Sequence, residues 1–324
     1  MLKNGYWFDL EDQSWTQLRF PTYAPFFGAE FYHPNTIHSL WGKPTIFGNS
    51  NNCDVTGKCD NKEIIQYDVD DDNWEVIGVM RESRTLHDVI EIPDSICDKI
   101  KPTPVEPADE NSAVLIIGGY RDVLSNGANL VTSVEIFGCD DHETSQSLDN
   151  YPYGIYLSSS VYYEGKVLTC GGFTTGSSTS RITNLCHELS PEEGEWLRSP
   201  SDLNNAKQAG IMALVRDLDV LDSVETVPAI LGSNLITEIY QPLTRNWREY
   251  KPLVDEDWNS YGCLIQHGDK IYNIKDSVME LDTTVWKVKQ IGEVPMFLRE
   301  PGMCSIAEHQ GKTGKQNYFI FCST

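Results

Sequence analysis

The sequence predicts an all-β fold, a single ring of six similar units known as a six-bladed β-propeller. Three observations predict it. Apolar runs that end in glycine recur along the chain, strand–turn–tryptophan patterns recur between them, and each end of the sequence supplies half of one unit. Long helical periodicity is largely missing. A ring of small repeats forms one domain even at 324 residues, because each unit packs only on its neighbours.

The first landmark is a short apolar run that ends at a glycine. It occurs at 44–49, 114–119, 166–172 and 228–233. Such a run predicts a fully buried strand followed by a tight turn, because glycine adopts the positive φ that the turn requires.

The second landmark is a strand, a polar turn and then a tryptophan. The tryptophans of this pattern are Trp15, Trp74, Trp196, Trp247 and Trp286. Each case predicts two antiparallel strands joined by a hairpin rich in Asp, Asn, Glu, Gly and Thr. We expect the tryptophan to pack between neighbouring units, where a large aromatic ring buries much area.

The spacing of these tryptophans predicts six units. They recur at intervals of about 50 residues, except that Trp74 and Trp196 are separated by about two such periods. One unit in that gap has lost its tryptophan. The first unit is expected to combine residues 1–20 with 297–324, so that strands from both ends of the sequence share one blade and close the ring. Closure removes the exposed sheet edges that invite aggregation.

A proline- and acid-rich stretch, residues 91–112, interrupts the third unit. It contains Pro93, Pro102, Pro104 and Pro107. We expect a long surface loop inserted before the next strand. Two interpretations stay open, a tolerated insertion and an arm that binds a partner.

The units resemble kelch repeats, in which a strand ending in a double glycine precedes a strand with a tyrosine and then a tryptophan. The matching residues are Gly118-Gly119 and Gly171-Gly172 for the glycines, and Tyr67 with Trp74 and Tyr240 with Trp247 for the aromatic pair. The resemblance covers essentially the whole chain, although Asn49 and Ser233 stand where second glycines are expected. It implies a fold rather than one function, because kelch propellers host many activities.

The net charge of the chain limits the classes of partner that it can bind. The formal net charge is −23, and no Lys/Arg-rich run offers the basic patch that nucleic acids require. Anionic membrane surfaces are disfavoured for the same reason. No apolar run is long enough for a transmembrane helix. The acidity is compatible with a basic partner or a neutral ligand, or with solubility alone.

We expect a protein-binding platform that acts as a monomer, with no catalysis, no cofactor and no metal. In kelch propellers the loops after the double glycines and the loops between blades form the face that contacts the partner. The candidate residues on this face are Arg81, Arg84, Tyr120, Arg121, Phe173, Arg181, Trp258 and Arg299. Arginine and aromatic residues are common hot spots. For Arg84 and Arg299 a structural role, pairing with backbone carbonyls, is an equally open interpretation.

An enzyme on the same fold is the alternative, either an oxidase similar to galactose oxidase or a carbohydrate-acting enzyme similar to sialate epimerases. The seven histidines are scattered over different units without paired metal spacing. This alternative predicts a deep central pocket with convergent carboxylates, Tyr or His and perturbed pKa values.

The nine cysteines leave the compartment open between an extracellular and a cytoplasmic protein. Three pairs are plausible from position: Cys170 with Cys186, Cys304 with Cys322, and Cys53 with Cys59. Cys97, Cys139 and Cys263 then remain unpaired. Disulfides would indicate an extracellular protein, and reduced buried thiols a cytoplasmic one.

Overall fold

A computed structural model gives the structure of the chain. It describes residues 5–18, 37–48, 62–68, 71, 73–93, 96–97, 113–121, 129–139, 145–175, 180–190, 194–216, 225–232, 236–250, 263–295, 303–310 and 316–323. The predicted all-β class is confirmed, because the described residues form antiparallel sheets almost throughout. Within them, no helix has the length and hydropathy to cross a membrane.

Six four-stranded antiparallel sheets make up most of the described chain. The first has the order β2-β1-β29-β28 and is built from β1 (Gly5–Asp9), β2 (Trp15–Leu18), β28 (Met303–Gln310) and β29 (Gln316–Ser323). The second is built from β3 (Ile37–Leu40), β4 (Lys43–Phe47), β5 (Glu63–Asp68) and β6 (Asn73–Val79). The third has the order β12-β11-β8-β7, with β7 (Asp88–Ile92), β8 (Ala113–Ile117), β11 (Val134–Phe137) and β12 (Gln146–Leu148).

The other three large sheets follow in chain order. The fourth is built from β14 (Ser159–Tyr163), β15 (Lys166–Cys170), β18 (Cys186–Ser190) and β19 (Glu195–Arg198). The fifth is built from β20 (Ile211–Arg216), β21 (Thr226–Leu231), β22 (Thr237–Gln241) and β23 (Asn246–Tyr250). The sixth is built from β24 (Cys263–His267), β25 (Lys270–Ile274), β26 (Ser277–Asp282) and β27 (Lys287–Glu293).

Two small sheets extend from this framework. One pairs β9 (Tyr120–Arg121) with β10 (Asn129–Leu130), and the other has the order β13-β16-β17, with β13 (Ile155–Tyr156), β16 (Phe173–Thr175) and β17 (Ser180–Ile182). Both small sheets use residues that directly follow a double glycine.

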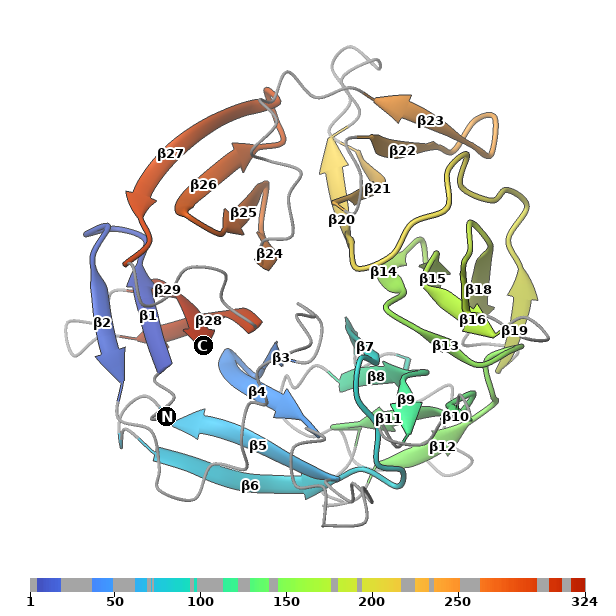
Figure 1. Cartoon of the computed structure of the whole chain (residues 1–324), viewed down its shortest axis with the longest axis horizontal. Coiled ribbons are helices and arrows are strands. Elements are labelled where there is room, and N and C mark those ends of the chain that lie inside the picture. Colours follow the sequence, from blue (N-terminus) through green and yellow to red (C-terminus); the bar gives the residue numbers. More distant parts are fainter. Residues whose placement is uncertain are drawn as a thin grey trace.

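The large sheets are arranged around a central axis, as Figure 1 shows. Each contributes one edge strand to an inner layer: β3, β7, β14, β20, β24 and β28. Neighbouring inner strands contact each other in this order, and β28 contacts β3. The arrangement is consistent with a β-propeller.

In the second to sixth sheets, the strand next to the inner one is largely buried, as the apolar runs predicted. All five residues of β8 are buried, and four of the five in β4. The outermost strand is mostly exposed or half-buried, for example β27, in which Ile291 is the one buried residue. β-Branched and aliphatic side chains suit the strand next to the inner one, because that strand is covered on both faces.

The predicted packing of the tryptophans between neighbouring sheets is seen directly. Trp247 lies in one apolar cluster with Cys170 of the fourth sheet and Ile230 of the fifth. The indole nitrogen of Trp15 donates to the carbonyl of Glu293 in the sixth sheet at 2.8 Å. These contacts join one sheet to the next, so the aromatic residue serves the ring rather than its own hairpin.

The last hairpin differs from the prediction. Trp286 does not begin β27 but ends the turn before it, with a φ of 50°. The turn between β26 and β27 is short, and the ring still packs 4.5 Å from that of Tyr250 in the fifth sheet. The inter-sheet role is therefore kept although the residue lies outside the strand.

The predicted loop 91–112 also requires correction where it is described. Glu91 and Ile92 belong to β7 and pair with Val114 and Ala113 of β8, because alternating apolar residues continue the strand past the predicted boundary. Cys97 is buried, so this part of the stretch is packed into the molecule. The rest of the stretch lies outside the described residues.

Candidate partner-binding face

The double glycines set the position of the two small sheets. Gly118 and Gly119 have φ values of 63° and 105°, and a side chain on Gly118 would come within 2.3 Å of the Ile155 carbonyl oxygen. The Gly119 N–H donates to that same oxygen at 2.7 Å. Only glycine combines the left-handed backbone with so close an approach. The chain therefore leaves β8 pressed against the next unit and turns into β9.

Gly171 and Gly172 repeat this arrangement one sheet further on. Their φ values are 69° and 90°, and the Gly172 N–H donates to the Lys207 carbonyl at 2.7 Å. The chain then enters β16. Equivalent turns thus place β9 and β16, and with them Tyr120 and Phe173, at corresponding positions of adjacent sheets.

Three aromatic rings form a continuous row across these two positions. The ring centroids of Tyr120 and Tyr156 lie 5.7 Å apart, and Tyr156 stacks on Phe173 at 5.0 Å with an interplanar angle of 14°. In the backbone register, Phe173 lies opposite Ile182, whose side chain is 43% exposed. All three rings are partly exposed. We call Tyr120, Tyr156, Phe173 and Ile182 the aromatic row.

Two of the predicted arginines flank the aromatic row. Arg121 follows Tyr120 directly and forms an ion pair with Glu82 at 2.7 Å. Arg181 precedes Ile182, is exposed and lies opposite Thr174 in β16. Burial tends to raise the pKa of Glu82, but hydrogen bonds from Arg121 and Ser133 and the charges of Arg121 and Arg84 outweigh it, so the pKa is lowered. Glu82 is therefore held ionised, and it partly neutralises Arg121.

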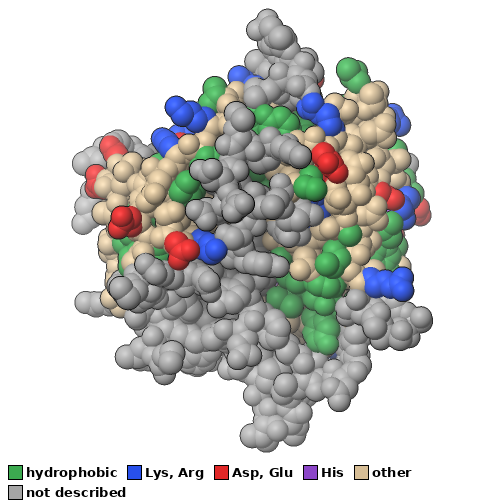
Figure 2. Space-filling view, turned by 45° about the horizontal axis from the view of Figure 1, so that its top comes forward, with side chains coloured by type: hydrophobic (Ala, Val, Ile, Leu, Met, Phe, Trp, Pro, Cys, Tyr) green, Lys and Arg blue, Asp and Glu red, His purple; other side chains and the backbone are tan. Residues whose placement is uncertain are grey.

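Figure 2 shows basic, acidic and hydrophobic side chains interspersed over one face of the molecule, with hydrophobic ones gathered in patches.

The aromatic row together with Arg121 and Arg181 is termed the hairpin face below. The described structure thus brings four predicted residues to two neighbouring small sheets: Tyr120, Arg121, Phe173 and Arg181.

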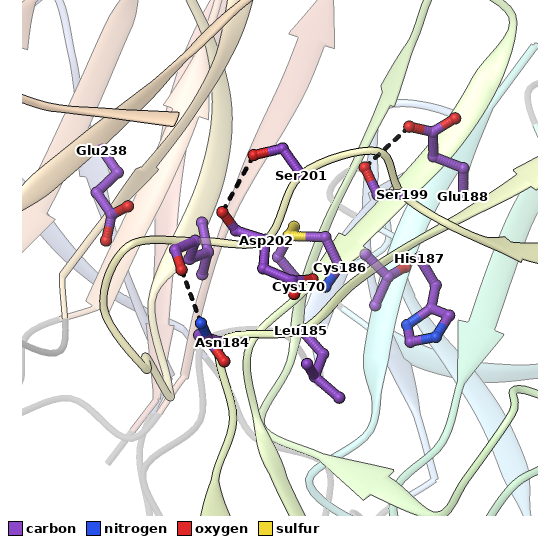
Figure 3. The surroundings of a disulfide bond; sticks show 12 residues. Cys170, Asn184, Leu185, Cys186, His187, Glu188, Ser199, Ser201, Asp202 and Glu238 are labelled. Atoms are coloured by element: carbon purple, nitrogen blue, oxygen red, sulfur yellow. Dashed lines mark hydrogen bonds between the residues drawn. A yellow bond between two sulfur atoms is a disulfide. The ribbon is translucent and has the colours of Figure 1, made fainter. Parts of the chain in front are cut away.

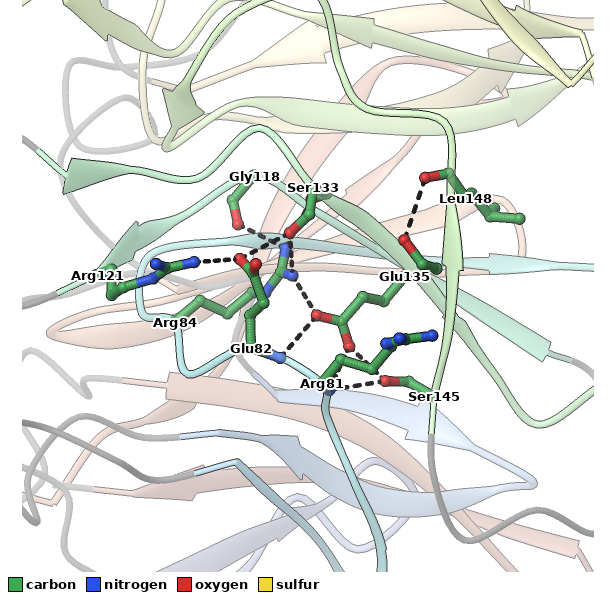
Figure 4. Close-up of polar contacts among 10 residues, drawn as sticks. Arg81, Glu82, Arg84, Gly118, Arg121, Ser133, Glu135, Ser145 and Leu148 are labelled. Carbon is green, nitrogen blue, oxygen red and sulfur yellow. Dashed lines mark hydrogen bonds and ion pairs between the residues drawn. The ribbon is translucent and has the colours of Figure 1, made fainter.

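Arg84 lies inside the molecule (Figure 4), where its side chain is 0% exposed. Its guanidinium donates to the carbonyl oxygens of Gly118 at 2.9 Å and Ser133 at 2.8 Å, and pairs with Glu135. Burial lowers the pKa of Arg84, and Glu135 opposes that effect. These contacts match the structural interpretation left open for Arg84, and its side chain is not accessible to a partner.

A second buried cation repeats this geometry in the fifth sheet. The Lys207 ammonium donates to the Ile236 carbonyl and lies 3.9 Å from Glu238. Glu238 accepts the N–H groups of Asn204 at 2.7 Å and Asn205 at 3.0 Å. Glu135 accepts those of Arg81 and Glu82 at the same two distances. In both places a buried carboxylate holds the segment that crosses from one sheet to the next.

The other predicted positions fall in different places. Arg81 is exposed, and its N–H takes part in the Glu135 contact. Trp258 and Arg299 lie outside the described residues. Tyr156 and Ile182 were not predicted from the sequence, because neither follows a double glycine nor belongs to a Tyr–Trp pair.

One predicted disulfide is present in the fourth sheet (Figure 3). Cys170 and Cys186 lie opposite each other in β15 and β18, with an S–S distance of 2.04 Å. The bridge directly precedes Gly171 and so braces the turn that leads to β16. The Cys186 N–H also donates to the Asp202 carboxylate at 3.0 Å.

The other observed or predicted pairs of cysteines divide into three cases. Cys97 and Cys139 form a second disulfide with an S–S distance of 2.13 Å, although the sequence analysis left both unpaired. Cys304 lies opposite Cys322 in the backbone register of β28 and β29. Cys53 and Cys59 lie outside the described residues.

A cavity of about 320 Å³ lies where the inner strands meet. Its lining comes from all six of these strands and includes His38, Asp88, Glu91 and Tyr162 beside aliphatic side chains. Within the described part of the chain, no group of three or more His, Cys, Asp or Glu is placed to hold a metal ion. The enzyme alternative stays an untested prediction.

No protein-family model matches the chain, and no curated protein matches it. Among the solved structures that match is that of YjhT, which is 15% identical with a TM-score of 0.44. The match covers 57% of this chain and 63% of that chain, so it spans less than two thirds of YjhT. The sheet topology, rather than this match, is the basis for the fold described above.

Proposed function

We propose that the chain is a closed six-bladed propeller of the kelch type and that it binds a protein or peptide partner through the hairpin face. The six sheets in ring order support the blade count. The pairing of β1 with β29, from Gly5 opposite Ser323 to Asp9 opposite Phe319, supports closure within the first sheet. The ring then serves as a rigid support for surface hairpins and acts as a monomer.

The observation that carries the function is the aromatic row. Tyr120, Tyr156 and Phe173 are held by backbone pairing and by mutual ring contacts, so little conformational entropy is lost when a partner covers them. Aromatic side chains in such rigid positions are the usual centres of binding energy in an interface.

The flanking charges favour a partner segment that combines an apolar side chain with an acidic one. The aromatic row, which includes Ile182, provides apolar contact, and Arg181 is an exposed cation beside it. The rest of the molecule is acidic, with a formal net charge of −23. A segment with acidic residues is therefore repelled elsewhere and attracted locally, which favours one orientation of binding.

The test compares proteins that co-purify with the full chain and with three single variants. Phe173→Ala and Ile182→Asp alter the hairpin face, whereas Leu243→Asp alters a 96% exposed side chain in the turn between β22 and β23. The proposal predicts that a discrete partner is lost from both face variants and retained by Leu243→Asp.

The affinity of each variant for the purified partner gives the magnitude of its effect on binding. Loss of a central aromatic anchor costs about 2 kcal/mol or more, so Phe173→Ala is expected to weaken binding by at least about tenfold. Unfolding transitions of all three variants are measured in parallel. Equal retention of the partner by all three folded variants would show that the hairpin face is not the binding surface.

A further inference from the structure

The central cavity is lined by aliphatic and acidic side chains. Its volume is about 320 Å³, at the lower end of the range for small-molecule pockets. One wall is aliphatic, formed by Val161, Met212, Leu214, Leu264, Ile265 and Ile306. Such a wall favours a ligand with an apolar body, because burial of apolar surface is favourable in water.

The charged groups of the lining are all acidic. Glu91 and Asp88 supply two carboxylates, and no Lys or Arg occurs among the described residues that line the cavity. The Glu91 side chain is 49% exposed, so it is hydrated and can exchange water for a cationic group at small cost. Asp88, three residues earlier on the same strand, is buried.

His38 completes the polar part of the lining. Its Nε2 is a buried atom without a hydrogen-bond partner among the described residues, and it lies 3.9 Å from a Glu91 carboxylate oxygen. Burial lowers the pKa of His38, and the charge of Glu91 acts in the opposite direction. A buried polar atom of this kind is ordinarily satisfied by a ligand or by water.

We propose that the central cavity binds a small organic cation, an ammonium group on an aliphatic body, with Glu91 as the counter-ion and the aliphatic wall around the body. This site lies on the inner strands and is independent of the hairpin face. Neutral alcohols lack the ion pair, and carboxylates are repelled by Glu91.

The experiment uses three probes with the same six-carbon body and different charge: hexylammonium, hexanol and hexanoate. They are titrated into the full chain, and binding is followed through the NMR signal of the Met212 methyl group, assigned by Met212→Leu. An ion pair with a half-exposed carboxylate changes affinity by up to about fivefold. Hexylammonium is therefore expected to bind about two- to fivefold more tightly than hexanol, and hexanoate more weakly than either.

Variants of single residues show which side chain causes the preference for hexylammonium over hexanol. Glu91→Gln is expected to remove the preference for hexylammonium over hexanol, whereas Glu75→Gln, at an exposed carboxylate of the outer strand β6, leaves it unchanged. Leu214→Trp, at another residue of the lining, fills the cavity while retaining both Glu91 and the Met212 methyl group, and is expected to abolish binding of both probes. This second variant keeps the test decisive if Glu91→Gln does not fold.

The opposite results are equally clear. Equal affinity for the three probes, tighter binding of hexanoate, or an unchanged preference in folded Glu91→Gln would overturn the proposal. Glucose is titrated as a fourth probe, and binding of glucose without binding of hexylammonium would overturn it in favour of a sugar site.

Discussion

At the residue scale, the described chain is held together at two of its sheet junctions by a buried acid and a buried base. Arg84 with Glu135 and Lys207 with Glu238 occupy corresponding positions. Each carboxylate also receives two backbone N–H groups of the crossing segment. Removal of the cation would leave a carboxylate buried without its counter-ion, which is far more costly than loss of an exposed pair.

Arg84→Met is therefore expected to lower the free energy of unfolding by about 3–5 kcal/mol. Arg121→Met is the matched control, because Arg121 pairs with Glu82 at the surface with its side chain 47% exposed, and such pairs contribute about 0–1 kcal/mol. Denaturant unfolding of the two variants measures the difference. Equal losses would contradict the role assigned to the buried pair.

A pH dependence follows from His187. It is buried, and its Nδ1 lies 3.1 Å from the Tyr151 hydroxyl. Burial lowers the pKa of His187 to about 4, the charge of Arg198 acts in the same direction, and Asp202 opposes it. Below its ordinary pKa of about 6.5 the unfolded chain binds the proton more readily than the folded one. The folded state therefore loses stability as the pH falls from 6.5 towards 4.

The measurement compares wild type with His187→Gln. The wild-type free energy of unfolding is expected to fall by up to about 1.4 kcal/mol per pH unit relative to the variant across this window. The difference between the two proteins should be constant above pH 7. Parallel curves throughout would show that His187 does not titrate differently in the folded and unfolded chains.

At the scale of elements, the two disulfides illustrate what the sequence could predict. Cys170 and Cys186 occur on neighbouring strands of one repeat, so the repeat pattern alone brings them together. Cys97 follows β7 inside the long interruption, where no repeat register applies. Its partner Cys139 could be identified only from the tertiary structure.

Closing a loop of 42 residues stabilises a protein by about 4 kcal/mol in the chain-entropy model. The double variant Cys97→Ser/Cys139→Ser is thus expected to unfold at lower denaturant concentration, while Cys263→Ser, also at a buried position, tests the effect of the substitution alone. A thiol count of the denatured protein, purified without reductant, complements this. Four of the nine cysteines lie in the two disulfides, so at most five thiols are expected. Nine would contradict both bridges.

The hairpin face likewise combines residues whose positions the sequence predicted with a residue that it did not. The double glycines predicted that Tyr120 and Phe173 occupy equivalent positions, because both follow a left-handed turn. Tyr156 lies in β13, before β14, and joins the aromatic row because β13 pairs with β16, opposite Phe173. Sequence spacing carries no signal for such a contact between successive units.

At the scale of the whole molecule, the account requires that strands from both ends of the chain form one cooperative unit with the rest. Trp7 stacks on Phe319 at 4.6 Å and contacts Tyr67 of the second sheet edge-on at 6.2 Å. Phe8 is fully buried. If the ring is closed, this sheet cannot open without exposing the cores on both of its sides.

Amide hydrogen exchange tests this closure. The amides of β1 and β29 are expected to exchange as slowly as those of β8 and β21, through global unfolding only. Phe319→Ala should accelerate exchange in every sheet rather than in the first alone. Fast exchange confined to β1 and β29 would show an open ring whose two ends fray.

The measurement that tests the proposed function most directly is site-specific photocrosslinking. A photoreactive phenylalanine analogue is placed at Tyr156 in the aromatic row and, as a control, at Tyr163 at the far end of β14. One discrete partner is expected to crosslink from position 156 and not from position 163 in an extract of cells that produce the protein. Crosslinks from position 163 alone, or the same products from both positions, would contradict the hairpin face as the binding surface.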